Sequence, residues 1–323
     1  MRDAHNTLLC TVDTTANLQS TPGPEYIRAR RGSAEMIPSE RSPYSAIVDR
    51  PPLKLPNGGR VIVWTITNLE VWDISRPMPR TAMPAPSGQT MLPDVTNWAW
   101  HEYGLRVGVW RFFKLFEKLG IRPTLSINAR VCEDYERVAA QARDAGWEFM
   151  AHGYDQIPMH KLEDQRGTIH RAMDVIEKFT GKRSIGWLGP GLSETWHTLD
   201  LLREHGVDYV CDWVNDDLPY RMNNGLYSIP YSIELNDMPL FNMPSISIDD
   251  FYRRICETFD VLYEEGERNG RVMAIALHPF LIGVPHRIRT LDRALQYIAG
   301  HGKVWFATGS EIIDAYRGQE RER

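Results

Sequence analysis

The chain has 323 residues, of which 42% are hydrophobic and 24% charged, and its formal net charge is -5. These shares exclude a disordered or collagen-like chain, and the length suits one large α/β domain. The negative charge argues against a surface built for nucleic acid. The 4 cysteines are scattered without C-x-x-C spacing, which predicts reduced thiols in the cytoplasm, and no segment is apolar enough to predict a membrane partner.

Residues 1–45 form a polar segment that shows neither a helical nor a strand period. We expect a flexible N-terminal arm there, followed by one folded domain over residues 46–323. The arm contains the basic run Arg28-Ala29-Arg30-Arg31. A solvated tail is the favoured interpretation of this run, and contact with an acidic partner is the alternative.

A different pattern begins at Pro51, where short apolar runs alternate with segments of helical period. Residues 60–67 (RVIVWTIT) predict a strand, and apolar residues at helical spacing predict a helix from Leu105 to Gly120. Residues 69–101 between them are rich in proline and tryptophan. We expect this insertion to form a loop over one end of the domain.

The alternation continues to the end of the chain and predicts a parallel sheet with outer helices. Further strands are expected over residues 123–127, 147–151, 184–188, 208–212, 227–235, 272–277 and 304–307, and helices over residues 133–145, 162–179, 199–202, 255–263, 288–298 and up to 316. A single (β/α) barrel of about seven parallel strands is the compact solution for this order. No G-x-G-x-x-G follows the first strand, so a dinucleotide-binding fold has no support.

Polar residues are concentrated just after the predicted strands, where barrel enzymes carry their active sites. These positions are Asn68 and Glu70, Asn128, His152, residues 189–191, residues 212–217, His278 and residues 308–309. We therefore expect a cleft built from the loops at this end of the barrel.

Two histidines are the leading catalytic candidates among these residues. His152 follows an apolar strand and precedes a glycine, so it can act as a general base or a ligand; the alternative is a hydrogen bond to a neighbouring loop. His278 ends the strand of IALHPF in the same way and could donate to an oxyanion or hold the base. His160 lies eight residues beyond His152, and its placement between cavity wall and surface stays open.

Carboxylates and tryptophans add further candidates. Glu70 directly follows the first strand, whereas Glu102 lies before a helix and could serve only as its cap. The run CDWVNDDLPY, which includes Asp217, predicts either a metal-binding cluster or a turn. Tryptophans near the strand ends, Trp187 among them, favour a flat, partly apolar substrate, with core packing as the alternative.

Several motifs resemble those of the polysaccharide deacetylase (NodB-homology) superfamily, a deformed (β/α) barrel, and within it the branch of the bacterial allantoinase and the cyclic imide hydrolases. They include HEYGLRVGVWR at 101–111, AHGYDQIPM at 151–159, TGKRSIGWLGPGLSET at 180–195 and ALHPFLIGVPHR at 276–287. The shorter motifs lie at 209–220, 229–239 and 303–312. The resemblance covers nearly the whole chain after the arm.

The resemblance also shows where this sequence departs from the deacetylases. Those enzymes bind a divalent metal with an aspartate after the first strand and with two histidines of an H-x-x-x-H run. The matching positions here are Asn68, His152 and Gln156, which are poorer zinc ligands as a set. The expectation is therefore a site without a cofactor, and the alternative is zinc, manganese or nickel held by Glu70, His152 and His160.

The reaction implied by the resemblance is the opening of a small cyclic amide, imide or ureide by C–N bond hydrolysis. His152 or Glu70 would be the base, and the backbone N–H of Gly191 in the loop Gly189-Pro190-Gly191 would meet the oxyanion with help from His278. Asn68 and Gln156 suit the N–H and C=O edges of an imide.

Two rival functions stay open, a metal-dependent deacetylase and a non-catalytic ligand-binding barrel. The resemblance and the aromatic insertion also predict a homo-oligomer, specifically a tetramer.

Overall fold

The computed structural model of the chain describes residues 36–85, 88–89, 91–241 and 246–321. Most of the predicted arm, residues 1–35, lies outside the described residues. Residues from Pro38 onward belong to one compact unit. Within this unit Arg41 forms a bidentate ion pair with Asp200 at 2.6 and 2.7 Å, so the last part of the predicted arm contacts the folded domain.

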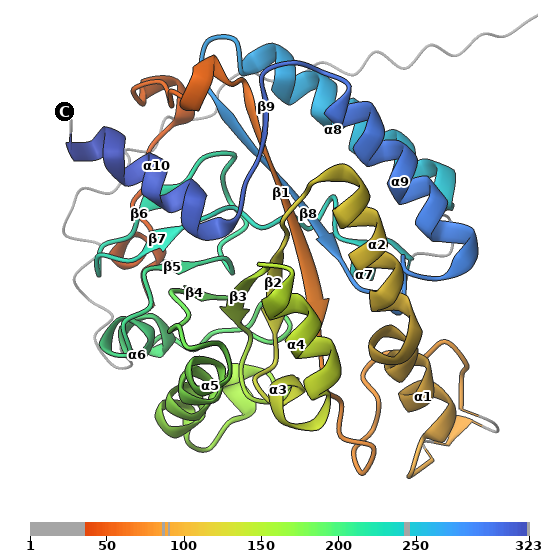
Figure 1. Cartoon of the computed structure of the whole chain (residues 1–323). Helices are drawn as coiled ribbons and strands as arrows, with labels where there is room; N and C mark the ends of the chain where they lie inside the picture. Colours follow the sequence, from red (N-terminus) through yellow and green to blue (C-terminus); the bar gives the residue numbers. More distant parts are fainter. Residues whose placement is uncertain (1–35, 86–87, 90, 242–245, 322–323) are drawn as a thin grey trace, which may run out of the picture. The chain divides into compact units, whose positions relative to one another are not determined.

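The described residues form a nine-stranded sheet with the order β6-β7-β5-β4-β3-β2-β1-β8, and β9 pairs with β1. In chain order the strands are β1 Val61–Leu69, β2 Thr124–Ile127, β3 Glu148–Ala151, β4 Gly186–Trp187, β5 Tyr209–Val210, β6 Tyr220–Arg221, β7 Tyr227–Ser228, β8 Arg271–Leu277 and β9 Val304–Phe306. The predicted barrel is confirmed as a curled half-barrel with surrounding helices (Figure 1).

Two features of the sheet correct the sequence-based expectation. The β6–β7 pair is antiparallel, unlike the others, because the chain turns back after β5. The strand expected over residues 227–235 ends at Ser228. Pro230 follows two residues later, and proline has no N–H to donate to a strand ladder.

Helices surround the sheet on its outer side (Figure 1). They are α1 Val95–Tyr103, α2 Val109–Leu119, α3 Val131–Asp134, α4 Glu136–Asp144, α5 Gln165–Thr180, α6 Thr198–Glu204, α7 Asp237–Phe241, α8 Ile248–Glu265, α9 Pro285–Ala299 and α10 Gly309–Arg321, with a π-helical turn over Gly104–Gly108. None of the described helices is both long and apolar enough to cross a membrane.

Three helical segments differ from the expectation. Helix α1 begins inside the insertion that the sequence predicts as a loop, because the Asp94 side chain accepts the backbone N–H of Asn97 and caps the helix. The helix expected over residues 133–145 is broken at Tyr135 into α3 and α4. The short helix α7 was not expected.

The alternation of side chains along the strands determines which residues reach the inside of the barrel. Even-numbered residues of β1 (Ile62, Trp64, Ile66) belong to an inner apolar cluster. Odd-numbered ones (Val61, Val63, Leu69) belong to the outer cluster, which contains the helix residues. Strand β8 alternates in the same way. Since successive side chains of a strand point to opposite faces, this period directs Asn68, Glu70 and His278 inward.

Candidate active site

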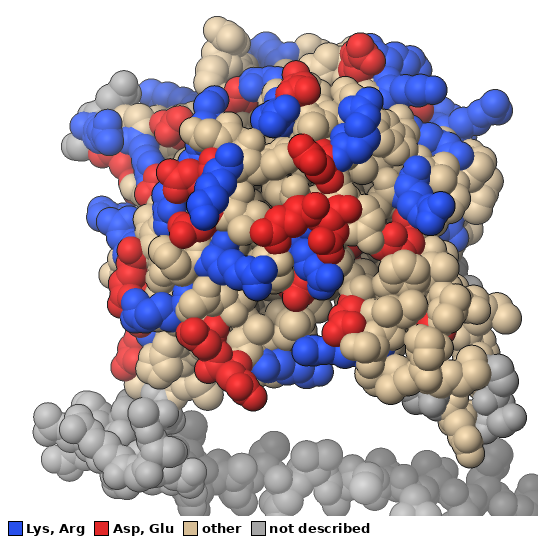
Figure 2. Space-filling view, turned by 60° about the horizontal axis from the view of Figure 1, so that its bottom comes forward, with Lys and Arg blue, Asp and Glu red and all other residues tan. Residues whose placement is uncertain are grey.

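A cavity of about 240 Å3 lies at the carboxyl end of the sheet, the end that faces the viewer in Figure 2. Six predicted site residues line it: Asn68, Glu70, His152, Gln156, Gly191 and His278. The strand register brings them together. Thr67 pairs with Leu277, so the next residues along, Asn68 and His278, are neighbours across β1 and β8.

Glu70 is the centre of the polar contacts in this cavity. Its Oε1 atom lies 3.5 Å from Nε2 of His278 and 3.7 Å from Nε2 of His152, and accepts a hydrogen bond of 2.9 Å from Nε2 of Gln156. Burial raises the pKa of the Glu70 carboxyl, but hydrogen bonds and charge from His152 and His278 outweigh burial and lower the pKa below its ordinary value. Glu70 is therefore an anion at neutral pH.

His278 is held by Asp237, a fully buried residue at the start of α7. The Nδ1 atom of His278 lies 2.6 Å from Oδ1 of Asp237, and its backbone N–H donates to Oδ2 at 2.8 Å. Burial lowers the pKa of His278, but the carboxylates of Asp237 and Glu70 outweigh it and raise the pKa to about 9. His278 is thus an imidazolium at neutral pH, with its Nε2–H available to the cavity.

His152 is held by a backbone carbonyl and not by a carboxylate. Its Nδ1 atom lies 2.7 Å from the backbone oxygen of Leu188. A carbonyl oxygen only accepts hydrogen bonds, so Nδ1 carries a hydrogen, and Nε2 is the ring nitrogen that faces Glu70 in the cavity. In its neutral form this ring can accept a proton at Nε2, as a general base does.

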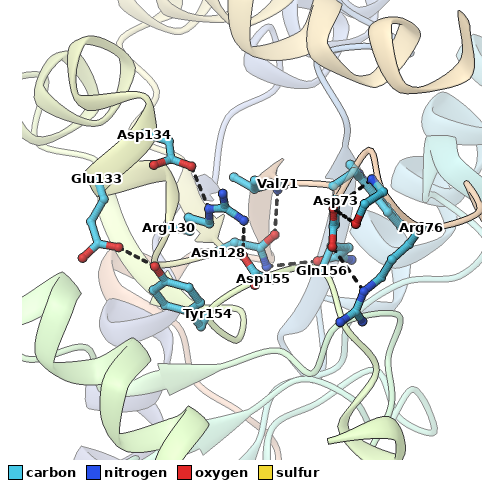
Figure 3. Close-up of polar contacts among 12 residues, drawn as sticks. Val71, Asp73, Arg76, Asn128, Arg130, Glu133, Asp134, Tyr154, Asp155 and Gln156 are labelled. Atoms are coloured by element: carbon cyan, nitrogen blue, oxygen red, sulfur yellow. Dashed lines mark hydrogen bonds and ion pairs between the residues drawn. The ribbon is translucent and has the colours of Figure 1, made fainter. Parts of the chain in front are cut away.

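A relay of amides fixes the orientation of Gln156 (Figure 3). The backbone N–H of Val71 donates to Oδ1 of Asn128 at 2.8 Å, and Nδ2 of Asn128 donates to Oε1 of Gln156 at 3.0 Å. The oxygen of Gln156 is thereby occupied, so its Nε2 faces Glu70. Gln156 presents hydrogens, not a lone pair, at the position of the second histidine in the deacetylase motif.

The side chains of the cavity do not fit a divalent metal. No group of three or more His, Cys, Asp or Glu side chains in the described part of the chain is arranged to hold one. Gln156 directs its N–H groups toward Glu70, and its oxygen is occupied by Asn128. A metal ion needs a lone pair at this position, which the N–H groups of Gln156 do not offer. A proton on His278 supplies the positive charge beside Glu70.

Tyr231 is a cavity residue that the sequence did not single out, because it fell within a predicted strand. Its oxygen accepts the hydrogen bond from Asn68, and its O–H hydrogen can in turn donate. Burial raises its pKa well above the ordinary value, so it stays a neutral donor. Asp237, the other functional residue that sequence reasoning missed, lies on the unexpected helix α7.

The glycine loop contributes less than expected. Gly191 lines the cavity with a φ of 69°, a conformation that suits glycine. The N–H of Gly189 instead donates to both oxygens of Asp212, at 2.8 and 3.0 Å. Pro190 lines a neighbouring cavity of about 240 Å3.

Four other candidates do not line the cavity, which corrects their assignment. Trp187 is completely buried in the outer apolar cluster, and His160 is exposed. Glu102 accepts a hydrogen bond of 2.5 Å from the Tyr135 hydroxyl. The backbone oxygen of Asp217 accepts the N–H of Val272 near the start of β8, at the end of the strand opposite His278. Asp217 lies there because the chain reverses direction after β5.

The chain is similar in sequence and fold to several known proteins. Residues 101–210 match the family model described as polysaccharide deacetylase. A putative polysaccharide deacetylase of Schizosaccharomyces pombe is 30% identical over 237 residues, covering 67% of this chain and 74% of that protein. The crystal structure of the Puue allantoinase superposes with a TM-score of 0.73 at 29% identity, covering 84% of this chain and 94% of that one.

A second solved structure, a probable polysaccharide deacetylase of Pseudomonas aeruginosa PAO1, gives a TM-score of 0.74 at 28% identity and covers 84% of this chain and 95% of that one. These matches confirm the resemblance that the sequence motifs indicate. The chain belongs to the polysaccharide deacetylase family.

Proposed function

We propose that the protein is a hydrolase that opens a small cyclic amide, imide or ureide at a C–N bond, without the metal triad of the deacetylases. One observation carries the proposal: Oε1 of Glu70 lies between the Nε2 atoms of His152, whose Nδ1 is bound by a backbone carbonyl, and of His278, whose Nδ1 is bound by a carboxylate. A base and an acid thus face the same cavity. The similarity to a protein named allantoinase supports the ring as the substrate class.

The first step is the attack of water on the ring carbonyl. Nε2 of His152 takes a proton from the water as its oxygen bonds to the carbonyl carbon. The carbonyl oxygen becomes an oxyanion, for which the O–H of Tyr231 and the N–H of Gly191, two residues that line the cavity, are the proposed donors. Glu70 is a weak base here because two imidazoles lower its pKa; its role is to hold His278 in the protonated state.

The second step breaks the C–N bond. The ring nitrogen takes the proton from Nε2 of His278 as the electron pair of the bond moves to it. The products are a carboxyl group and an N–H group on one open chain. His152 then holds the proton that came from water, and His278 lacks one, so the transfer of one proton through solvent restores both residues.

A metal-dependent deacetylase of an N-acetylated substrate is the second candidate. The names of the relatives in S. pombe and P. aeruginosa favour it. The two functions differ in the substrate that is consumed and in the need for metal.

A substrate panel tests the proposed function. Purified protein is incubated with allantoin, hydantoin, dihydrouracil, succinimide and an N-acetylglucosamine oligomer, and ring opening and acetate release are measured. The His152→Ala protein, purified in parallel, reports contaminating activity. We expect ring opening of at least one cyclic compound above this background. Acetate release alone would support the deacetylase, and no turnover of any compound would support a binding barrel.

A further inference from the structure

A second, much smaller cavity of about 10 Å3 adjoins Glu70. Its lining includes Asn68, Glu70, Trp72, His101 and Phe280. A space of roughly 10–15 Å3 is enough for one water molecule, provided that polar atoms are there to bind it. The cavity is too small for a substrate.

Two buried polar atoms belong to residues of this cavity and have no hydrogen-bond partner in the described part of the chain. They are Oε2 of Glu70 and Nε2 of His101. The Glu70 side chain is 7% exposed and His101 is 5% exposed. Buried polar atoms without a partner are rare in native proteins. Both atoms therefore require a partner, and the cavity that their two residues line is the space adjoining both side chains.

Both atoms are acceptors of hydrogen bonds. Nδ1 of His101 lies 2.7 Å from the backbone oxygen of Asn97, so Nδ1 carries the hydrogen and Nε2 keeps a lone pair. Burial lowers the pKa of His101, which keeps the ring neutral. Oε2 belongs to an ionised carboxylate. The partner must consequently donate one hydrogen to each of the two atoms, as a water molecule can.

We infer that one ordered water molecule occupies this cavity and donates one O–H to Oε2 of Glu70 and the other to Nε2 of His101. His101 is thereby a positioning residue for Glu70. Rings of Trp72, Trp100 and Phe280 pack around the imidazole with centroid distances of 5.0, 5.1 and 4.6 Å. They hold His101 in place and exclude further water.

The bridge sets the rotation of the Glu70 carboxylate. With Oε2 bound to the water, Oε1 stays directed at Gln156, His152 and His278. The effect on catalysis rests on the proposed function, whereas the presence of the water does not. The two statements are therefore tested by separate measurements.

The first measurement is a crystal structure of the wild-type protein at a resolution that shows ordered water. We expect density for one water within about 2.6–3.2 Å of both Oε2 of Glu70 and Nε2 of His101. A well-ordered cavity without density would overturn the inference, even for a protein in which no ring-opening activity is found.

The second measurement compares three substitutions of His101. His101→Gln places an amide oxygen near the position of Nε2, whereas His101→Asn keeps a donor near Nδ1 but lacks that acceptor. His101→Phe keeps the ring and loses both nitrogens. We expect ring-opening kcat within about threefold of wild type for the glutamine variant and about tenfold lower for the other two, with KM unchanged.

The pKa of the Glu70 carboxyl separates positioning from general damage to the fold. Without the bridging water the charged form of Glu70 loses a hydrogen-bond donor, so this pKa rises in the Asn and Phe variants. Infrared or NMR spectroscopy of the Glu70 carboxyl group measures the change. The Gln variant should keep the wild-type value. Equal kcat and an equal Glu70 pKa in all three variants would show that the Nε2 acceptor has no positioning role.

Discussion

The imidazole of His278 connects two carboxylates: its Nδ1 atom lies 2.6 Å from Oδ1 of Asp237, and its Nε2 atom lies 3.5 Å from Oε1 of Glu70. Both carboxylates favour the protonated ring, which is why the pKa of His278 rises to about 9 although burial opposes it. The ring is therefore ready to protonate a leaving nitrogen at neutral pH.

The first prediction concerns Asp237→Asn. Because the raised pKa keeps His278 protonated, wild-type turnover should persist up to about pH 9 and fall above it. Removing the charge of Asp237 should move this alkaline limb down by roughly 1–3 pH units. The pH dependence of kcat measures the shift. The exposed residue Asp249 offers a control, since Asp249→Asn should leave the limb in place. An unshifted limb in Asp237→Asn would remove His278 as the acid.

The second prediction concerns the proposed base, His152, and Glu70, the carboxylate that keeps His278 protonated. His152→Ala and Glu70→Gln should each lower ring-opening turnover by at least about a hundredfold, the usual scale for a positioned acid or base. Circular dichroism should show an unchanged fold. His170 is exposed and lies 3.2 Å from the Asp174 carboxylate, so His170→Ala is the matched control and should keep full activity. Near-normal turnover in both site variants would refute the assignment.

The third prediction concerns the loop that carries the Leu188 carbonyl. Asp212 accepts the N–H of Gly189 at 2.8 Å, and the nearby Glu194 accepts from the Trp213 ring at 3.1 Å. Burial raises the pKa of both carboxyls, that of Glu194 to about 6. The pair thus shares a proton in the folded protein.

A carboxyl whose pKa is higher in the folded than in the unfolded protein stabilises the fold at pH values below its unfolded-state pKa. This stabilisation is lost as the pH rises through the folded-state pKa. Wild-type protein should therefore lose about 1–2 kcal/mol between pH 4 and 7 through this pair. In Glu194→Gln the amide donates to ionised Asp212, and this loss should disappear. Thermal unfolding at several pH values tests it; parallel Tm curves for both proteins would contradict the shared proton.

The fourth prediction is a homo-oligomer, with a tetramer as the proposed state. Met83, Met91, Leu92 and Val95 in the insertion are 59%, 48%, 57% and 57% exposed. The uncharged area at the lower right of Figure 2 lies on the α1 side of the molecule. Light scattering should give a multiple of 37.2 kDa. The double variant Val95→Glu and Met83→Glu puts charges on this apolar surface and should lower the measured mass of the oligomer. The charge at position 95 does not harm the helix, because a carboxylate is favourable at a helix start. A 37.2 kDa wild-type species at micromolar concentration would refute it.

Much of the fold is predictable from the sequence because the alternation of apolar runs with helical periods is regular after Pro51. The inward positions of Asn68, Glu70 and His278 follow from the two-residue period of strands β1 and β8. Local patterns do not predict α7, which is only five residues long and has no repeated period. Asp237 was missed for this reason, although it holds His278.

The remaining errors concern the direction of the chain after each strand. Asp217 and His160 were candidates for the cavity because each follows a predicted strand or its loop, although the surface stayed an alternative for His160 and a simple turn for Asp217. The chain reverses after β5 and carries Asp217 to the other end of β8, and His160 turns to the surface. Such reversals depend on tertiary packing that a one-dimensional pattern does not contain. Trp187 was proposed as a substrate contact, but it lies in a strand of only two residues. So short a strand shows no alternation of apolar and polar residues that would tell which face of the sheet its side chain joins.

The central claim is that the cavity works with a protonated His278 and not with a divalent metal. The most direct measurement is ring-opening turnover before and after extended dialysis against a chelator, with bound metal quantified in the same samples. The account predicts unchanged turnover in metal-depleted protein and no gain from Gln156→His. Loss of turnover on chelation, with recovery on adding zinc, manganese or nickel, would contradict it and make His152 a metal ligand.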